Sequence, residues 1–177
     1  MSSQSDYRPN FDLTGSVMLI TGPARGLGRA STLACAAAGA DIVLGLRDPG
    51  SDGELAAEIQ KMGRKVLPLQ LDVTRMDQIK TGVAQAIDRF GRIDILLNNV
   101  GVGPENPAEK VTESDFDFTL NANLKGTFFV TQAVGKAMIQ RKKGRIINMS
   151  SQAGSVVLHG EAIYCMTKAA INHLTRC

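Results

Sequence analysis

The sequence contains few of the side chains that build metal sites or disulfide frameworks. It has two histidines, too few for most metal sites, so we predict that the chain binds no metal. Its three cysteines, Cys35, Cys165 and Cys177, are odd in number and show no ligand-like spacing. Because disulfides persist mainly in oxidising compartments, this usage indicates reduced thiols and a cytoplasmic location.

Long apolar runs and concentrated charge are also absent. No run approaches the roughly 20 apolar residues that a transmembrane helix needs, and the polar start over residues 1–10 lacks the apolar stretch of a signal peptide. The formal charge is +3 and the densest basic run is Arg141–Lys143, which gives little support to nucleic-acid binding. We therefore expect neither a membrane nor a nucleic acid as a partner.

The chain does have enough apolar material for a buried core. Its 177 residues, 44% of them hydrophobic, predict one domain over residues 13–177, preceded by a flexible tail over residues 1–12. Strands are predicted at 17–21, 41–46, 65–71, 93–97 and 145–149, and helices at 26–38, 54–62, 74–90, 112–140 and from about 161 onwards. This alternation is typical of an α/β doubly wound parallel sheet with helices on both faces.

Three local features refine this prediction. Pro68 lies inside the third strand and favours an edge position, because proline cannot donate to a central ladder. Thr74 and Asp77 resemble a capping box at the start of a helix, and the helix over 112–140 is expected to bend near Asn123. In such a sheet, ligands bind at the carboxyl ends of the strands.

A glycine-rich loop follows the first predicted strand. Gly22, Gly26 and Gly28 occur where that strand turns into a helix. Glycine there allows a tight turn and a close approach of the backbone to a phosphate, and the helix N-terminus favours an anion. A plain tight turn without a ligand is the alternative. A Walker phosphate loop is excluded because no Gly-Lys-Ser/Thr follows.

Tyr164 and Lys168 are four residues apart in a predicted helix and therefore share one face. A nearby ammonium favours the phenolate and lowers the pKa of a tyrosine, which would let the pair act as a general acid or base. On their own, the two residues are better explained as a surface tyrosine beside a solvated lysine, because this spacing occurs often by chance. Serines 150 and 151 follow the fifth predicted strand, where a hydroxyl can hold a substrate oxygen, and no Gly-x-Ser-x-Gly elbow is present.

Taken together and in order, these motifs resemble the short-chain dehydrogenase/reductase family, over residues 11–177. The matching positions are the loop Thr21–Gly28, Asp72 with Val73, Asn98–Gly101, Asn123, Ser151, Tyr164 and Lys168. The resemblance implies a Rossmann-like three-layer sandwich with strand order 3-2-1-4-5. Ser151 is preferred over Ser150 because it lies thirteen residues before the tyrosine, as the family pattern has it.

The sequence departs from the family pattern in two places. Val100 stands where the family usually has alanine, a change that adds bulk and removes no reacting group. Family members are also longer, and the last predicted helix runs to Cys177 without a glycine or proline stop, so we expect a chain that is incomplete at its C-terminus.

The resemblance also implies a mechanism. Tyr164 would exchange the proton of a substrate hydroxyl, and Ser151 would hold the substrate oxygen. Lys168 would assist the tyrosine and bind the nicotinamide ribose, and Asn123 would hold a water that relays protons. The cofactor contacts expected from the family pattern are Gly22, Arg25, Gly26, Leu27, Gly28, Arg47, Asp72, Val73, Asn99, Gly101, Tyr164 and Lys168.

The choice of nicotinamide cofactor depends on charges near the second strand. Asp48 lies twenty residues after Gly28, a spacing that suits an acid binding the ribose of NAD. Arg47 and Arg25 are two cations that suit the 2′-phosphate of NADP, because guanidinium binds phosphate in a fork. We expect NADP, with NAD as the alternative.

The expected reaction interconverts a secondary alcohol and a ketone, with a sugar or polyol or a 3-oxoacyl thioester as substrate. The alternatives are a non-catalytic dinucleotide-binding sensor or scaffold, and an inactive fragment of such an enzyme. The family also implies a homodimer or homotetramer, with Phe128, Phe129 and the residues around Met138 in the core and interface.

Overall fold

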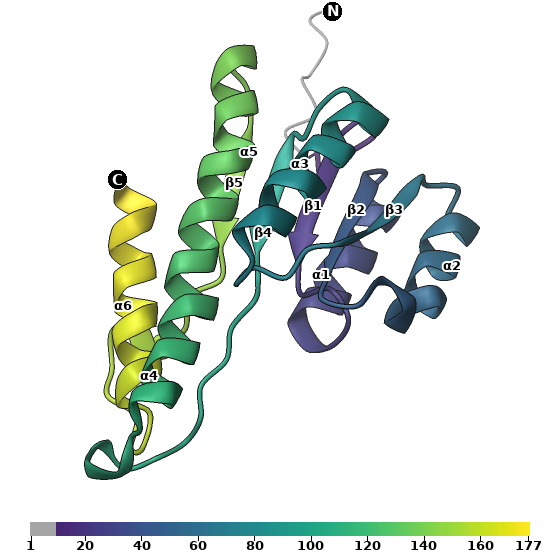
Figure 1. Cartoon of the computed structure of the whole chain (residues 1–177). Coiled ribbons are helices and arrows are strands. Elements are labelled where there is room, and N and C mark those ends of the chain that lie inside the picture. Colours follow the sequence, from purple (N-terminus) through teal and green to yellow (C-terminus); the bar gives the residue numbers. More distant parts are fainter. Residues whose placement is uncertain (1–9) are drawn as a thin grey trace, which may run out of the picture.

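The computed structural model describes residues 10–177, except for the side chains of residues 51 and 52. These residues form a five-stranded parallel sheet in the order β3-β2-β1-β4-β5, flanked by helices on both faces (Figure 1). The predicted fold class and strand order are therefore confirmed. Most of the predicted tail lies outside the described residues, and residues 10–12 adopt no regular structure.

The elements agree with the predicted order. The strands are β1 (Val17–Thr21), β2 (Asp41–Leu46), β3 (Val66–Gln70), β4 (Ile95–Asn98) and β5 (Arg145–Asn148). The α-helices are α1 (Gly26–Ala37), α2 (Gly53–Lys61), α3 (Met76–Phe90), α4 (Glu113–Leu120), α5 (Thr127–Arg141) and α6 (Ala162–Arg176). Short turns of helix occur at η1 (Pro49–Asp52), η2 (Ala108–Lys110), η3 (Asn121–Gly126) and η4 (Gln152–Gly154).

The central strand β1 is buried on both faces, which explains its continuous apolar sequence. Val17 and Leu19 join one core cluster with residues of α3 and α5, whereas Met18 and Ile20 join a second cluster with residues of α1 and α2. Successive side chains of a strand point to opposite faces, so one short segment contributes to both cores. Together the two cores and the sheet make three layers.

Pro68 lies in β3, which is an edge strand of the sheet, as predicted. Pro68 pairs in register with Leu44 of β2, and β3 has no neighbour on its other side within the described chain. The missing N–H of Pro68 therefore costs no ladder hydrogen bond.

Where the sequence predicted a bend near Asn123, a π-helical turn, η3, lies between α4 and α5. Thr112 caps α4 by accepting a hydrogen bond from the N–H of Asp115 at 3.1 Å. The capping box predicted at Thr74 is wrong, because α3 begins only at Met76 and its N-cap, Arg75, makes no capping bond. The Thr74 hydroxyl instead donates to Asp72 at 2.7 Å, in a local turn that competes with capping.

None of the helices in residues 10–177 combines the length and the apolar character that crossing a bilayer would need.

A partly buried carboxylate joins three elements at the amino end of the sheet. Asp94 accepts hydrogen bonds of 2.9 Å from the N–H of Val17, the Arg92 guanidinium and the Arg141 guanidinium. Burial alone would raise the pKa of Asp94, but the Val17 hydrogen bond and the two guanidinium groups outweigh it and lower the pKa below 3.8. Asp94 therefore stabilises the folded chain in its ionised form.

We expect Asp94→Asn to lower the free energy of unfolding by about 1–3 kcal/mol at pH 7, because it removes charge-assisted hydrogen bonds. The carboxyl pKa is lower in the folded than in the unfolded chain. Its contribution is therefore complete above the unfolded value and is lost as pH falls through the folded one. Urea denaturation from pH 7 to pH 3 measures this difference. The matched control is Asp77→Asn, which alters an exposed pair with Arg75 and should have little effect. An equal effect of both variants at pH 7 would contradict the assignment.

Candidate active site

The predicted site residues gather at the carboxyl end of the sheet. The glycine loop follows β1, Asn99 follows β4, and Ser150 and Ser151 follow β5. Because β1, β4 and β5 are parallel neighbours, their carboxyl ends meet at one edge (Figure 1). Helix α6, which carries Tyr164 and Lys168, packs against α4, η3 and η4 at this end.

The glycine loop needs glycine for two different reasons. Gly22 and Gly26 have φ of +66° and +55°, values that side chains rarely adopt. At Gly28 the reason is space, since a Cβ would lie 2.2 Å from the Gly22 carbonyl oxygen and 2.5 Å from the Asn99 amide nitrogen. The loop therefore closes tightly onto the first turn of α1.

Asn99 supports this loop. Its side-chain amide donates to the carbonyls of Gly22 at 2.9 Å and Thr21 at 3.3 Å, and its N–H donates to the Thr21 hydroxyl at 3.1 Å. The amide donors are thus engaged within the protein. Asn99 shapes the place where a cofactor would lie, rather than reaching toward it with its side-chain amide.

The N-terminus of α1 suits an anion. The N-cap residue Arg25 makes no capping bond with its side chain, and the first turn holds no acidic residue. Leu27 beside it is 68% exposed. Backbone N–H groups of a first turn carry partial positive charge, so this end of α1 fits the pyrophosphate of a dinucleotide.

Asp72 and Val73 follow β3 and are largely occupied by local packing. One Asp72 oxygen accepts from both the N–H and the hydroxyl of Thr74, at 2.9 and 2.7 Å. Val73 is 5% exposed and lies against the position where a Cβ of Gly126 would be, 2.8 Å away. Any contact of Val73 with an adenine ring would therefore have to use its backbone.

Lys168 places a charge inside the protein. It is 2% exposed, and its ammonium donates to the Met149 carbonyl at 2.7 Å, just after β5. The ammonium lies 5.4 Å from the centroid of the Tyr164 ring. Burial lowers the pKa of Lys168. An ammonium has three donors and only one is used within the described chain, which leaves capacity for the hydroxyls of a ribose.

The two serines after β5 are distinguished by their partners. The Ser150 hydroxyl donates to the Lys168 carbonyl at 3.3 Å and so ties the strand end to α6. The Ser151 oxygen accepts from the N–H of Ala153 at 3.2 Å, and within residues 10–177 its hydroxyl proton has no acceptor. Ser151 is therefore the serine whose proton remains available to a ligand.

Asn123 is fully buried in η3, and its side chain is engaged. It accepts from the N–H of Val102 at 2.8 Å and donates to the Val102 carbonyl at 2.7 Å and the Thr167 hydroxyl at 3.0 Å. Both amide protons are thereby used. A water held by Asn123, as the sequence suggested, would have to bind elsewhere on the residue, and the side chain itself joins η3, α6 and the segment after β4.

Sequence reasoning missed two residues that position this site, and it named Asn98 in a motif without predicting its contacts. Met149 contributes only its carbonyl, and Val102 only its backbone, so no residue type could reveal them. Asn98 is buried and donates to Asn148 on β5 and Thr131 on α5, at 2.9 and 2.8 Å. The side-chain amide oxygen of Asn98, Oδ1, has no partner among the described residues. Neighbouring asparagines in register on β4 and β5 are a detectable signal, but only once the strand pairing is known.

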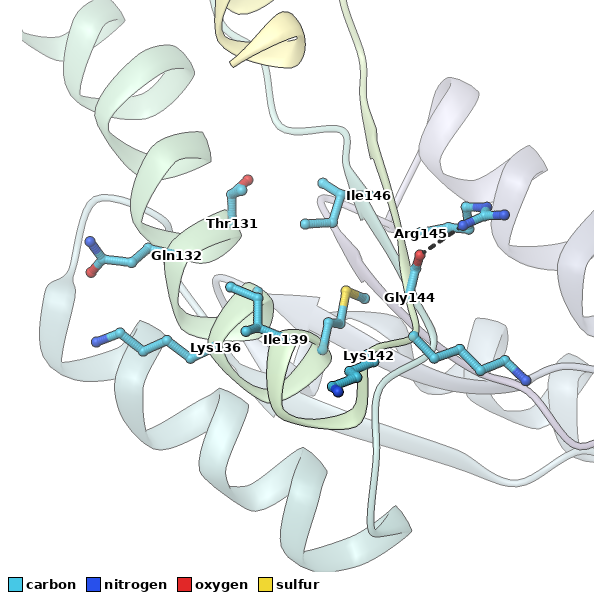
Figure 2. Close-up of a pocket in the computed structure, with 11 residues that line it drawn as sticks. Thr131, Gln132, Lys136, Ile139, Lys142, Gly144, Arg145 and Ile146 are labelled. Atoms are coloured by element: carbon cyan, nitrogen blue, oxygen red, sulfur yellow. Dashed lines mark hydrogen bonds between the residues drawn. The ribbon is translucent and has the colours of Figure 1, made fainter.

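A cavity of the structure lies away from these residues. It has about 680 Å³ and lies between the C-terminal half of α5 and the start of β5, with Lys136, Ile139 and Ile146 among its lining (Figure 2). None of its lining residues belongs to the predicted site, and it lies at the opposite end of β5 from Ser151. This cavity is therefore separate from the predicted site residues.

We expect Lys168→Met to leave the free energy of unfolding at pH 7 unchanged or raise it by about 1 kcal/mol, because it removes a buried charge that has no carboxylate partner. The lowered pKa of Lys168 means that the folded chain binds its proton less tightly. The advantage of methionine should thus shrink as pH rises toward 10.5, the ordinary lysine value. Urea denaturation at several pH values tests this, with the exposed Lys80→Met as control. A large loss of stability at pH 7 would refute the argument.

Comparison with known proteins agrees with this geometry. A family model described as short chain dehydrogenase matches residues 16–177. The chain is 39% identical over 164 residues to the 3-oxoacyl-[acyl-carrier-protein] reductase FabG of Thermotoga maritima, covering 93% of this chain and 67% of that protein.

Two solved structures are similar as well. A short-chain type dehydrogenase/reductase from Mycobacterium marinum has a TM-score of 0.90 at 34% identity, covering 94% of this chain and 69% of that one. An NAD⁺-bound xylitol dehydrogenase has a TM-score of 0.88 at 32% identity, covering 92% and 63%. The chain thus spans about two thirds of the length of these proteins. It belongs to the short-chain dehydrogenase family of oxidoreductases.

Proposed function

We propose that the chain carries the catalytic centre of an NAD(P)-dependent enzyme that interconverts a secondary alcohol and a ketone. The observation that supports this most directly is the buried Lys168 ammonium, 5.4 Å from the Tyr164 ring centroid and hydrogen-bonded to the end of β5. Burying an ammonium costs desolvation free energy. A proton-transfer function would explain why a charge is buried at this position. A purely structural tyrosine would not require a neighbouring buried cation.

Each residue would have a distinct task. A bound nicotinamide would supply or accept the hydride. The Tyr164 hydroxyl would give or take the proton of the substrate oxygen, and the Ser151 hydroxyl would donate a hydrogen bond to that oxygen. The remaining donors of Lys168 would hold the cofactor ribose. The turn at Gly22–Gly28 and the first turn of α1 would hold the pyrophosphate.

The substrate class follows only coarsely from the relatives. One is named a 3-oxoacyl-[acyl-carrier-protein] reductase and another a xylitol dehydrogenase. A polyol or sugar and a 3-oxoacyl thioester both present a carbon that alternates between hydroxyl and carbonyl. We infer a small-molecule substrate of one of these two classes.

We also infer a homo-oligomer in the cytoplasm. The location is supported by the three cysteines, which are free thiols, as a reducing compartment would leave them.

The homo-oligomer is supported by exposed apolar side chains. Phe118 and Phe128 are 51% and 44% exposed, and a second cavity of about 610 Å³ lies beside Phe128 along α4, η3 and α5. Exposed apolar surface of this kind suits a self-association face.

The Tyr164→Phe variant tests the proposed proton transfer. Removing the hydroxyl should lower kcat by about 10²–10⁴-fold, the usual contribution of a general acid or base, while leaving cofactor affinity nearly unchanged. Turnover is followed by NAD(P)H absorbance on a panel of polyols, sugars and 3-oxoacyl thioesters, and affinity by cofactor fluorescence. The control is His159→Gln, an exposed residue in the loop before α6. Cofactor binding without turnover by the parent chain would contradict the proposal and favour one of the two alternatives, a sensor or scaffold or an inactive fragment.

For the cofactor we infer a preference for NADP. Arg47 directly follows β2, and Arg25 precedes α1; both are exposed. The Asp48 side chain, which could otherwise bind a ribose hydroxyl, accepts from the N–H of Gly50 at 3.0 Å and caps η1. The two guanidinium groups favour an additional phosphate.

Replacing both arginines, Arg25→Gln with Arg47→Gln, should weaken NADPH binding by about tenfold or more, since each lost charge-assisted hydrogen bond contributes about 1.5–3 kcal/mol. NADH binding should change much less, because NADH lacks the 2′-phosphate. Fluorescence titration with both cofactors measures the ratio. Arg75→Gln, an exposed arginine near α3, serves as the control. A parent chain that prefers NADH would overturn the inference.

A further inference from the structure

We propose that Gly103 is a positioning residue for Tyr164: the absence of a side chain at this position lets the segment after β4 pack directly on the tyrosine and thereby sets where the phenol lies. The inference rests on the proposed function, in which that phenol transfers the proton. It adds a residue that lies outside the glycine loop and outside the Asn98–Gly101 motif.

Tyr164 supplies the three heavy atoms nearest to the space beside Gly103. A Cβ added to Gly103 would lie 2.9 Å from Cδ2, 3.1 Å from Cβ and 3.1 Å from Cγ of Tyr164. These distances are shorter than ordinary van der Waals contact. Gly103 does not have a positive φ, so its backbone conformation does not itself call for glycine. The requirement is therefore one of space.

The segment that carries Gly103 cannot easily retreat. On one side, Val102 is held by Asn123 through both its N–H and its carbonyl. On the other side, the N–H of Asn106 donates to the Gly160 carbonyl at 2.9 Å. Pro104 follows directly, and its fixed φ further limits local movement.

The helix on the other side of the contact is also anchored. Thr167 of α6 accepts from Asn123 at 3.0 Å, and Lys168 donates to Met149 at 2.7 Å. With both backbones fixed, a methyl group at position 103 would be accommodated mainly by movement of the Tyr164 ring. That movement would change the placement of its hydroxyl relative to the ammonium of Lys168.

Gly101 provides an informative contrast within the same segment. A Cβ there would lie 3.2 Å from Nζ of Lys168, which is the far end of a flexible side chain. The long side chain of Lys168 has several rotatable bonds over which such a contact can be relieved. The ring of Tyr164 is rigid and is attached close to its own backbone, so the constraint at Gly103 is stricter.

The aromatic composition of the chain provides a direct readout. It has no tryptophan and two tyrosines, Tyr7 and Tyr164, so in a Tyr7→Phe background the tyrosine band of the near-ultraviolet circular dichroism spectrum comes from Tyr164 alone. We expect Gly103→Ala to change this band and to lower kcat by about 10- to 100-fold, as expected for a reacting group displaced by a fraction of an ångström to one ångström. The dissociation constant for NADPH should stay within about threefold, because the ring contact does not involve the phosphate site. Gly135→Ala is the matched control, since no heavy atom lies within 4 Å of its added Cβ.

A thermal double-mutant cycle covers the case in which Gly103→Ala is too unstable for kinetics. Tyr164→Ala removes the ring atoms at 2.9 and 3.1 Å, so the loss of Tm caused by alanine at position 103 should be smaller in that background. Additive losses of Tm, or an unchanged tyrosine band with unchanged kcat, would overturn the proposal. If Tyr164→Phe retained full turnover, the proposed function would fail instead, and the dichroism and the cycle would still report the contact at Gly103.

Discussion

The ammonium of Lys168 is the constraint on which the arrangement of the site depends. A charged group that is 2% exposed must find a polar partner, and among the described residues that partner is the Met149 carbonyl at the end of β5. This hydrogen bond fixes α6 against the carboxyl end of the sheet. It also places Lys168 beside Tyr164 on the same helix. The glycine at 101 leaves open the side of the ammonium on which a ribose would bind.

A second buried polar group maintains this geometry. Asn123 has no exposed surface, and its amide joins η3, α6 and the segment after β4 through three hydrogen bonds. The wide π-helical turn at η3 brings the amide to this position without a break in the long helical stretch from α4 to α5. Because a buried amide is costly when unsatisfied, these contacts favour one arrangement of the three segments over others. Asn123 thus stabilises the site indirectly, through its hydrogen bonds to Val102 and Thr167.

The sequence allowed the sheet and its ligand edge to be predicted because both depend on local patterns. The continuous apolar run of β1 and the glycines at 22, 26 and 28 are visible without tertiary information, and so is the four-residue spacing of Tyr164 and Lys168. What could not be predicted depends on contacts between distant segments. Thr74 was expected to cap α3, but Asp72 captures its hydroxyl instead. The contact between Gly103 and Tyr164 joins residues that are 61 positions apart, and neither residue type predicts it from the sequence.

The distribution of charge across the sheet explains how the fold tolerates such a site. At the carboxyl end, Lys168 is buried without a carboxylate within ion-pair distance among the described residues, and Asn98 keeps a buried oxygen without a partner. Both features cost stability. At the amino end, Asp94 is matched by two guanidinium groups and a backbone N–H, which ties β1, the start of β4 and the end of α5 together. The charged network around Asp94 thus lies at the end of the sheet away from the predicted site residues, whereas at the carboxyl end the ammonium of Lys168 keeps donors that a ligand could satisfy. In the folded chain without a ligand, two donors of the Lys168 ammonium have no partner among the described residues, and this raises the free energy of that state. A ligand that accepts hydrogen bonds from these donors would remove the penalty, and this gain would contribute to its binding.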